Sequence, residues 1–214
     1  MNTTQSSDPQ QMLDLIDETR RTTVGRLTRR YTLLLVVWAV AWALGFLALW
    51  VTEDVGAHSL LSPVAGWIVF AAAMLLAFTW SAVAGIAAAG DGIRGRSQLQ
   101  GALYGFSWTI VMLCAFLLMW ALQNNGLSAE LAALLYPAVY VFLVGALYLS
   151  GGALWRGVPM YVLGVVLIIT AVAATFAGVP THYLVYAVVG PLAMLLVAGL
   201  MLAGKIPASI PEPA

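Results

Sequence analysis

The sequence predicts an all-α polytopic membrane protein: an up-and-down bundle of six transmembrane helices, preceded by an N-terminal amphipathic helix, with both termini in the cytoplasm. Three observations predict it. Of 214 residues, 62% are apolar and only 8% are charged, whereas soluble domains carry about a quarter charged residues. Six apolar stretches are long enough to cross a bilayer, which takes about 20 residues. All nine Lys and Arg residues fall on one side of these stretches.

The six predicted spans contain no Lys, Arg or Asp, and Glu130 touches only the first residue of one. They cover residues 31–51, 63–89, 102–122, 130–150, 158–177 and 183–203. In lipid the backbone polar groups must be satisfied within each segment, so α-helices are expected. Short connections make neighbouring helices antiparallel. The chain therefore divides into an arm (1–30), a six-helix transmembrane domain (31–204) and a short tail (205–214).

The positive charges predict the orientation. They are Arg20, Arg21, Arg26, Arg29, Arg30, Arg94, Arg96, Arg156 and Lys205. With an even number of spans, the loops on the opposite side carry no positive charge at all. The positive-inside rule places the charged side, and with it both termini, in the cytoplasm.

The arm, "SDPQQMLDLIDETRRTTVGRLTRRY", predicts a helix that starts at Pro9 with Asp8 as its cap. Its apolar residues Leu13, Ile16, Val24 and Leu27 fall roughly on one stripe. One interpretation is a membrane anchor whose arginines contact anionic lipid head groups. The other is a docking helix for a cytoplasmic partner such as an ATPase. Nucleic acid is not an expected partner, because the arm is short and its acids offset its arginines.

The docking interpretation uses Arg20 and Arg21 of the arm with Arg94 and Arg96 of the loop after the second span. That loop contains "GDGIRG", which fits the dinucleotide pattern G-x-G-x-x-G, but it follows a lipid-spanning helix and not a strand. The stretch "GLMLAGKI" near the C-terminus lacks the Ser or Thr of a phosphate-binding P-loop. We therefore expect no nucleotide or other cofactor on this chain.

Ionisable residues at mid-membrane depth are the usual markers of proton and ion pathways, and the predicted spans have none. This argues against a proton pump, a voltage sensor, a carboxylate-coupled antiporter and an intramembrane enzyme. Glu53, Asp54, His58 and His182 share the opposite face, but no tight ligand spacing supports a metal site.

Aromatic residues at helical spacing are the candidate lining of a cavity for a neutral or lipophilic molecule. The candidate binding residues are Trp42, Tyr104, Trp108, Tyr140 and Tyr148, together with Glu130 near the opposite surface. The alternative for the aromatic residues is packing in the core or against lipid. The alternative for Glu130 is a solvated first-turn acid with Ser128 as N-cap.

Small residues spaced by four predict close helix packing, either within the bundle or between two copies in a homo-oligomer. Gly101 and Gly105 form one such pair, and Ser81, Gly85 and Ala89 form a second ridge. The sequence leaves both uses open.

The segments "MLDLIDETRRTTVGRL", "WAVAWALGFLALW", "GALYGFSW" and "ALYLSGGALWRGVPMYVLGVVL" resemble a group of small six-helix membrane proteins of actinobacteria. The resemblance covers nearly the whole chain and implies a bundle fold in a bacterial cytoplasmic membrane. It brings no catalytic residue. With the lipid bilayer as its surroundings, the chain is predicted to be a transport-related subunit for a neutral or lipophilic small molecule, working with a separate ATPase or other membrane subunit. The alternative is a non-transporting accessory, sensor or assembly protein.

Overall fold

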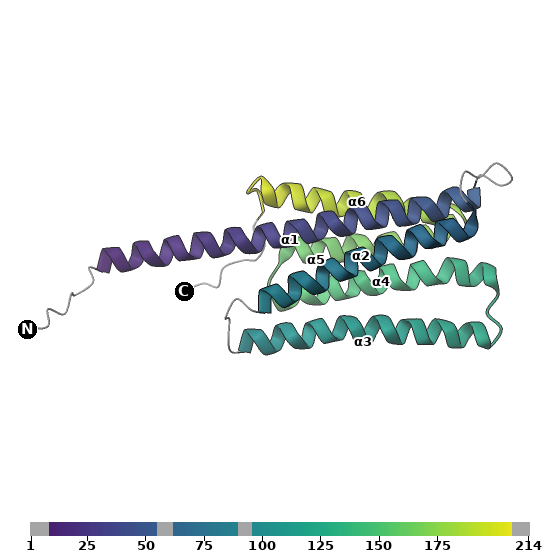
Figure 1. The fold of residues 1–214 in the computed structure, drawn as a ribbon, viewed down its shortest axis with the longest axis horizontal. Helices are drawn as coiled ribbons and strands as arrows, with labels where there is room; N and C mark the ends of the chain where they lie inside the picture. The colour runs from purple at the N-terminus through teal and green to yellow at the C-terminus, as the bar shows by residue number, and fades with distance from the viewer. Residues whose placement is uncertain (1–8, 55–61, 90–95, 207–214) are drawn as a thin grey trace, which may run out of the picture.

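The computed structural model describes residues 9–54, 62–89 and 96–206 of the chain. They form six α-helices: α1 (Pro9–Asp54), α2 (Pro63–Ala89), α3 (Arg96–Asn124), α4 (Ala129–Leu154), α5 (Val158–Ala177) and α6 (Thr181–Leu202) (Figure 1). All six are long and apolar enough to cross a membrane. The predicted all-α fold with six spans is confirmed, and the chain is a multi-pass membrane protein; the cytoplasmic location of the termini stays a prediction.

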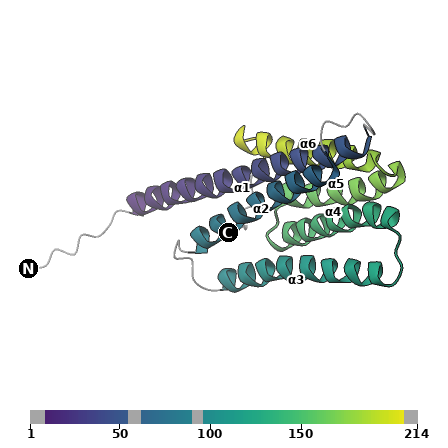
Figure 2. The ribbon, with the colours of Figure 1, turned by 45° about the vertical axis from the view of Figure 1, so that its right-hand side comes forward.

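The bundle has a four-helix core and two flanking helices. Extensive contacts join α1 to α6, α6 to α5 and α5 to α4, while α2 packs on α1 and α3 packs on α4. In both ribbon views α3 lies along one edge of the bundle, beside α4 (Figures 1 and 2). The extensive pairs therefore form an open series, α2–α1–α6–α5–α4–α3, and α2 and α3 are its two ends.

Glycines set the closest helix approaches. At Gly164 on α5, an added Cβ would lie 2.6 Å from the backbone nitrogen of Leu149 and 2.7 Å from the carbonyl oxygen of Gly145, both on α4. At Gly66 on α2, it would lie 2.7 Å from Cγ2 of Thr52 on α1. Small residues let helix backbones approach closely in lipid, where dispersion contacts replace the hydrophobic effect as the driving force.

The core is built from large apolar side chains of the four central helices. Leu35, Leu163, Leu167, Tyr186 and Met194 are almost completely buried within one cluster. By contrast, only 6% of the membrane-spanning window of α2 and 11% of that of α3 are buried, against 44% for α1. Most of the surface of α2 and α3 is therefore left to lipid.

Side-chain hydrogen bonds connect α3 to α4. From α3, Gln100 donates to the Leu154 carbonyl (3.4 Å) and Tyr104 to the Leu147 carbonyl (2.7 Å). From α4, Tyr136 donates to Gln123 Oε1 (3.1 Å) and Tyr140 to the Met112 carbonyl (3.3 Å). They reach from one end of the interface to the other. Long polar side chains thus join these two helices where α4 and α5 use direct glycine contacts.

The arm and the first span form one continuous helix. The predicted start at Pro9 is confirmed, and α1 runs without a break through the expected boundary at residue 30. The membrane-spanning part begins at Thr28, so the preceding part is about 30 Å long at ~1.5 Å per residue. It projects beyond the ends of the other helices (Figure 1), and the described side chains of Met12, Leu13 and Leu15 on it are exposed.

Candidate functional site

Five aromatic side chains meet at the end of the bundle from which α1 projects. Tyr104 and Trp108 lie on α3, Tyr148 on α4, and Trp155 just after α4. Tyr104 stands edge-on to Trp155 and Trp108, with ring centroids 4.7 and 6.2 Å apart, and Trp108 stands edge-on to Tyr148 at 5.7 Å. Tyr31 of α1 completes this aromatic cluster: like Trp108, it is half-buried and packs against the hydrophobic core that contains Tyr148.

Local sequence explains how the cluster forms. Tyr104 and Trp108 are four residues apart, so they share one face of α3. On α4, Gly151 has no side chain, and Tyr104 fills that space: an added Cβ would lie 2.5 Å from the Tyr104 hydroxyl oxygen. The hydroxyl then donates to the carbonyl of Leu147, one turn earlier. A glycine, a tyrosine and a backbone carbonyl thus fix the position of α3 on α4.

The hydroxyl groups of this cluster differ in their hydrogen bonding. Tyr104 is bonded at 2.7 Å, whereas the buried hydroxyl of Tyr31 has no hydrogen-bond partner among the residues that the structure describes. A buried hydroxyl without a partner costs about 1–3 kcal/mol. Most such groups in proteins have a protein or water partner, and the exceptions call for an explanation such as a bound water, an ion or another bound molecule.

Thr32, the next residue on α1, is a second exception. It is 3% exposed, and its Oγ1 also lacks a partner. Seven other Ser and Thr hydroxyls within the spans donate to a carbonyl three or four residues earlier in their own helix: those of Thr52, Thr79, Ser81, Ser107, Ser150, Thr170 and Thr175. The first turns of the α1 span therefore hold two adjacent buried hydroxyls with unused capacity.

Among its five side chains the aromatic cluster has no charged group. Such a site can hold a neutral molecule, with aromatic edges and faces contacting its apolar part and the Tyr31 hydroxyl bonding to one polar atom. Its described geometry offers hydrogen bonding and apolar contact.

The structure brings together three of the six predicted binding residues, Tyr104, Trp108 and Tyr148. Trp42 lies instead in the core, 4% exposed, between α1 and α6; an added Cβ on Gly190 would lie 2.7 Å from its ring. Tyr140 lies two turns before Tyr148 on α4, and its hydroxyl donates to the Met112 carbonyl of α3 outside the cluster. Glu130 is exposed in the first turn of α4, where Ser128 caps the helix by accepting from the Leu131 N–H at 3.3 Å.

The predicted docking residues can be placed only in part. The side chains of Arg20, Arg21 and Arg96 lie outside the described residues, as does Arg94 entirely. His58 and the side chain of Asp54 also lie outside them. Within the described ranges, no group of three or more His, Cys, Asp or Glu side chains could hold a metal ion.

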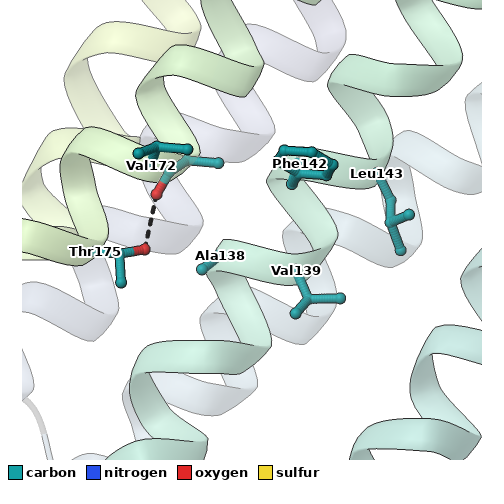
Figure 3. A pocket seen from close by; sticks show the side chains of 7 residues that line it. Ala138, Val139, Phe142, Leu143, Val172 and Thr175 are labelled. Atoms are coloured by element: carbon teal, nitrogen blue, oxygen red, sulfur yellow. Dashed lines mark hydrogen bonds between the residues drawn. The ribbon is translucent and has the colours of Figure 1, made fainter.

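A separate apolar groove of about 250 Å³ lies between α4 and α5 (Figure 3). It is lined by Ala138, Val139, Phe142, Leu143, Ala171, Val172 and Thr175. Its one side-chain hydroxyl, on Thr175, is already bonded to the Ala171 carbonyl at 2.8 Å. This groove suits a hydrocarbon chain, and it shares no residue with the aromatic cluster.

Sequence reasoning missed Tyr31 and Trp155. Tyr31 stands at the junction of the arm and the first span, where an aromatic residue looks like an interfacial anchor. It precedes Trp38 by seven residues and Trp42 by eleven, so it belongs to the same face of α1. This helical spacing could have identified Tyr31 as a candidate binding residue. Trp155 carried no signal, because the turn after α4 determines its position.

No family model matches the chain, and neither the curated proteins nor the solved structures contain a similar one. The resemblance to actinobacterial six-helix proteins therefore stays a prediction.

Proposed function

We propose that this chain is a non-enzymatic, transport-related subunit of a bacterial cytoplasmic membrane that binds a neutral, lipophilic molecule at the aromatic cluster. The observation that carries the proposal is the buried hydroxyl of Tyr31, which has no hydrogen-bond partner among the described residues and belongs to the aromatic cluster. A polar ligand atom would give this hydroxyl its missing partner. The absence of charge among the five side chains favours a neutral ligand over an ion.

The position of the cluster supports movement of a ligand as well as binding. Its side chains come from α1, α3 and α4, and α3 is an end of the open helix series, packed extensively on α4 alone. A helix held mainly from one side can shift more easily than a core helix, because fewer contacts oppose the motion. Such a shift of α3 would move Tyr104 and Trp108 relative to Tyr31.

Partner docking belongs to the same proposal. The arm of α1 projects about 30 Å at ~1.5 Å per residue, with exposed Met12, Leu13 and Leu15, and offers a surface to a cytoplasmic ATPase or another subunit. Arg20, Arg21, Arg94 and Arg96 are the charged residues assigned to it. Copurification in mild detergent tests this part: Arg20→Glu with Arg21→Glu should release the ATPase, and wild type without any ATPase would contradict it.

The test of the binding site compares two tyrosines. Wild type, Tyr31→Phe and Tyr136→Phe are purified from host membranes in nanodiscs, and extracted small molecules are identified by mass spectrometry. Tyr136 is the matched control because its hydroxyl bonds to Gln123 at the other end of the bundle. A neutral lipophilic compound should accompany wild type and Tyr136→Phe, and should be reduced about ten-fold in Tyr31→Phe for a lost hydrogen bond of about 1.4 kcal/mol.

Stability distinguishes this result from damage to the fold. Removing an unbonded hydroxyl should leave the ligand-free Tyr31→Phe protein at least as stable as wild type. Equal retention of the compound by all three proteins, or no enriched compound in wild type, would refute the binding proposal.

An accessory or assembly protein is the second candidate. It is favoured by the glycines of the two flanking helices, since an added Cβ on Gly85, Gly101 or Gly105 would meet nothing within 4 Å. These faces are open to another helix. A partner or second copy retained by wild type and lost from Gly85→Ile, without any bound small molecule, would favour this reading.

A further inference from the structure

His182 is a fully enclosed ionisable side chain outside the aromatic cluster. It lies in the first turn of α6 and is 0% exposed. Its ring lies against Tyr183 with centroids 3.9 Å apart, and Tyr186 stands edge-on at 6.0 Å. This position is at the end of the bundle opposite the arm, far from the candidate ligand site.

Both nitrogens of the imidazole face backbone carbonyl oxygens. Nδ1 is 3.2 Å from the carbonyl oxygen of Gly178, and Nε2 is 3.2 Å from that of Ala133 on α4. A neutral imidazole has one N–H donor and one acceptor nitrogen, whereas the charged ring has two donors. Because carbonyl oxygens only accept, the neutral ring can make one of these two bonds and the protonated ring makes both.

The carbonyl on α4 is available because of a proline. In an α-helix the Ala133 carbonyl would accept from the backbone N–H of residue 137, but Pro137 has none. His182 Nε2 takes the place of the missing N–H donor beside this oxygen, and the Tyr183 hydroxyl approaches the same oxygen at 3.5 Å. The bond therefore joins α6 to the turn of α4 in which Pro137 leaves the Ala133 carbonyl without a backbone donor.

The charged and titratable groups around the ring are few. Glu53, exposed at the end of α1, is the acid that interacts electrostatically with His182, and Glu130 is exposed in the first turn of α4. Tyr183 and Tyr186 are the neighbours on α6 itself. From α5 and its connection to α6, only the Gly178 carbonyl and uncharged side chains face the ring among the described residues.

We propose that His182 is a proton-binding site that couples α6 to the proline-interrupted turn of α4: proton uptake converts a one-bond contact into a two-bond clamp. The ligand of this site is the proton itself, and the response is a tighter connection between the first turns of α4 and α6. The proposal is independent of the aromatic cluster and of transport.

The test observes the ring directly. His58 and His182 are the only histidines, so His58→Gln protein labelled with ¹⁵N-histidine gives the two ring signals of His182 in bilayers. From about pH 8 to about pH 5, the ring nitrogen that is unprotonated at pH 8 should change to a protonated resonance while α4 and α6 remain folded. A ring that keeps one unprotonated nitrogen throughout this range would overturn the proposal and leave His182 as a fixed neutral hydrogen-bond donor.

A second measurement tests the clamp. Spin labels at Leu131→Cys on α4 and Val188→Cys on α6, both exposed positions, are placed in a Cys114→Ala background. Acidification should narrow the distance distribution when His182 is present. In His182→Gln, whose amide can donate to Ala133 but gains no proton, the distribution should not change. The same pH response in both proteins would also overturn the proposal.

Discussion

At the scale of single residues, the close packing of the helices depends on glycines at the contact points. Gly164 of α5 is pressed against backbone atoms of Leu149 and Gly145 on α4, and a backbone cannot rotate away as a side-chain end can. Gly164→Ala should therefore separate α4 from α5 and destabilise the protein by about 1–3 kcal/mol, the usual range for overpacking. Equilibrium unfolding in mixed micelles measures this free energy.

Gly85 on α2 is the matched control. An added Cβ there would meet nothing within 4 Å, and alanine is a better helix former than glycine by about 1 kcal/mol in water. Gly85→Ala should thus leave the free energy of unfolding unchanged or raise it. If both alanine variants were equally stable, the close approach at Gly164 would not be what holds α4 to α5.

At the scale of helices, α3 differs from the core helices because polar side chains tie it to one neighbour. Tyr104→Phe combined with Tyr140→Phe removes two hydrogen bonds and keeps both rings. Interhelical hydrogen bonds in membranes are worth about 0.6–2 kcal/mol each. The double variant should exchange the amide hydrogens of α3 faster than wild type, while exchange in α5 and α6 stays the same.

Tyr161→Phe provides the comparison for this prediction, since Tyr161 is exposed on α5. Removing the Tyr161 hydroxyl should not change amide hydrogen exchange in any helix. Unchanged exchange of α3 in the double variant would show that apolar contacts with α4, and not these hydrogen bonds, hold α3 in place.

The lengths of the helices could be predicted from sequence, but their neighbours could not. Hydrocarbon thickness fixes a span of about 20 apolar residues, so the predicted 158–177 matches α5 and the predicted 63–89 matches α2. A span that is apolar on all sides has no face to show which helix it meets. Helical spacing correctly grouped Tyr104 with Trp108, yet it could not tell that Trp42 would pack on Gly190 instead.

At the scale of the whole molecule, the order of the helices follows the chain with one break. Each helix packs on the next one along the sequence, except that no extensive contact joins α2 to α3. The first and last helices, α1 and α6, also pack together. An even number of spans then puts Pro9, where α1 begins, and the end of α6 on the same side of the membrane. That geometry holds whichever side is cytoplasmic.

The positions of the positive charges predict which side of the membrane is cytoplasmic. Cysteines are introduced one at a time in a Cys114→Ala background by Gln11→Cys, Asn125→Cys and Ala203→Cys, at exposed positions that leave all nine Lys and Arg in place. In intact cells a membrane-impermeant maleimide should label the Asn125→Cys protein and should reach the other two only after the membrane is opened, because the side with the positive charges stays inside. The reverse pattern would refute the orientation while keeping the fold, whereas labelling of the Gln11→Cys and Ala203→Cys proteins from opposite sides would refute the six-span topology itself.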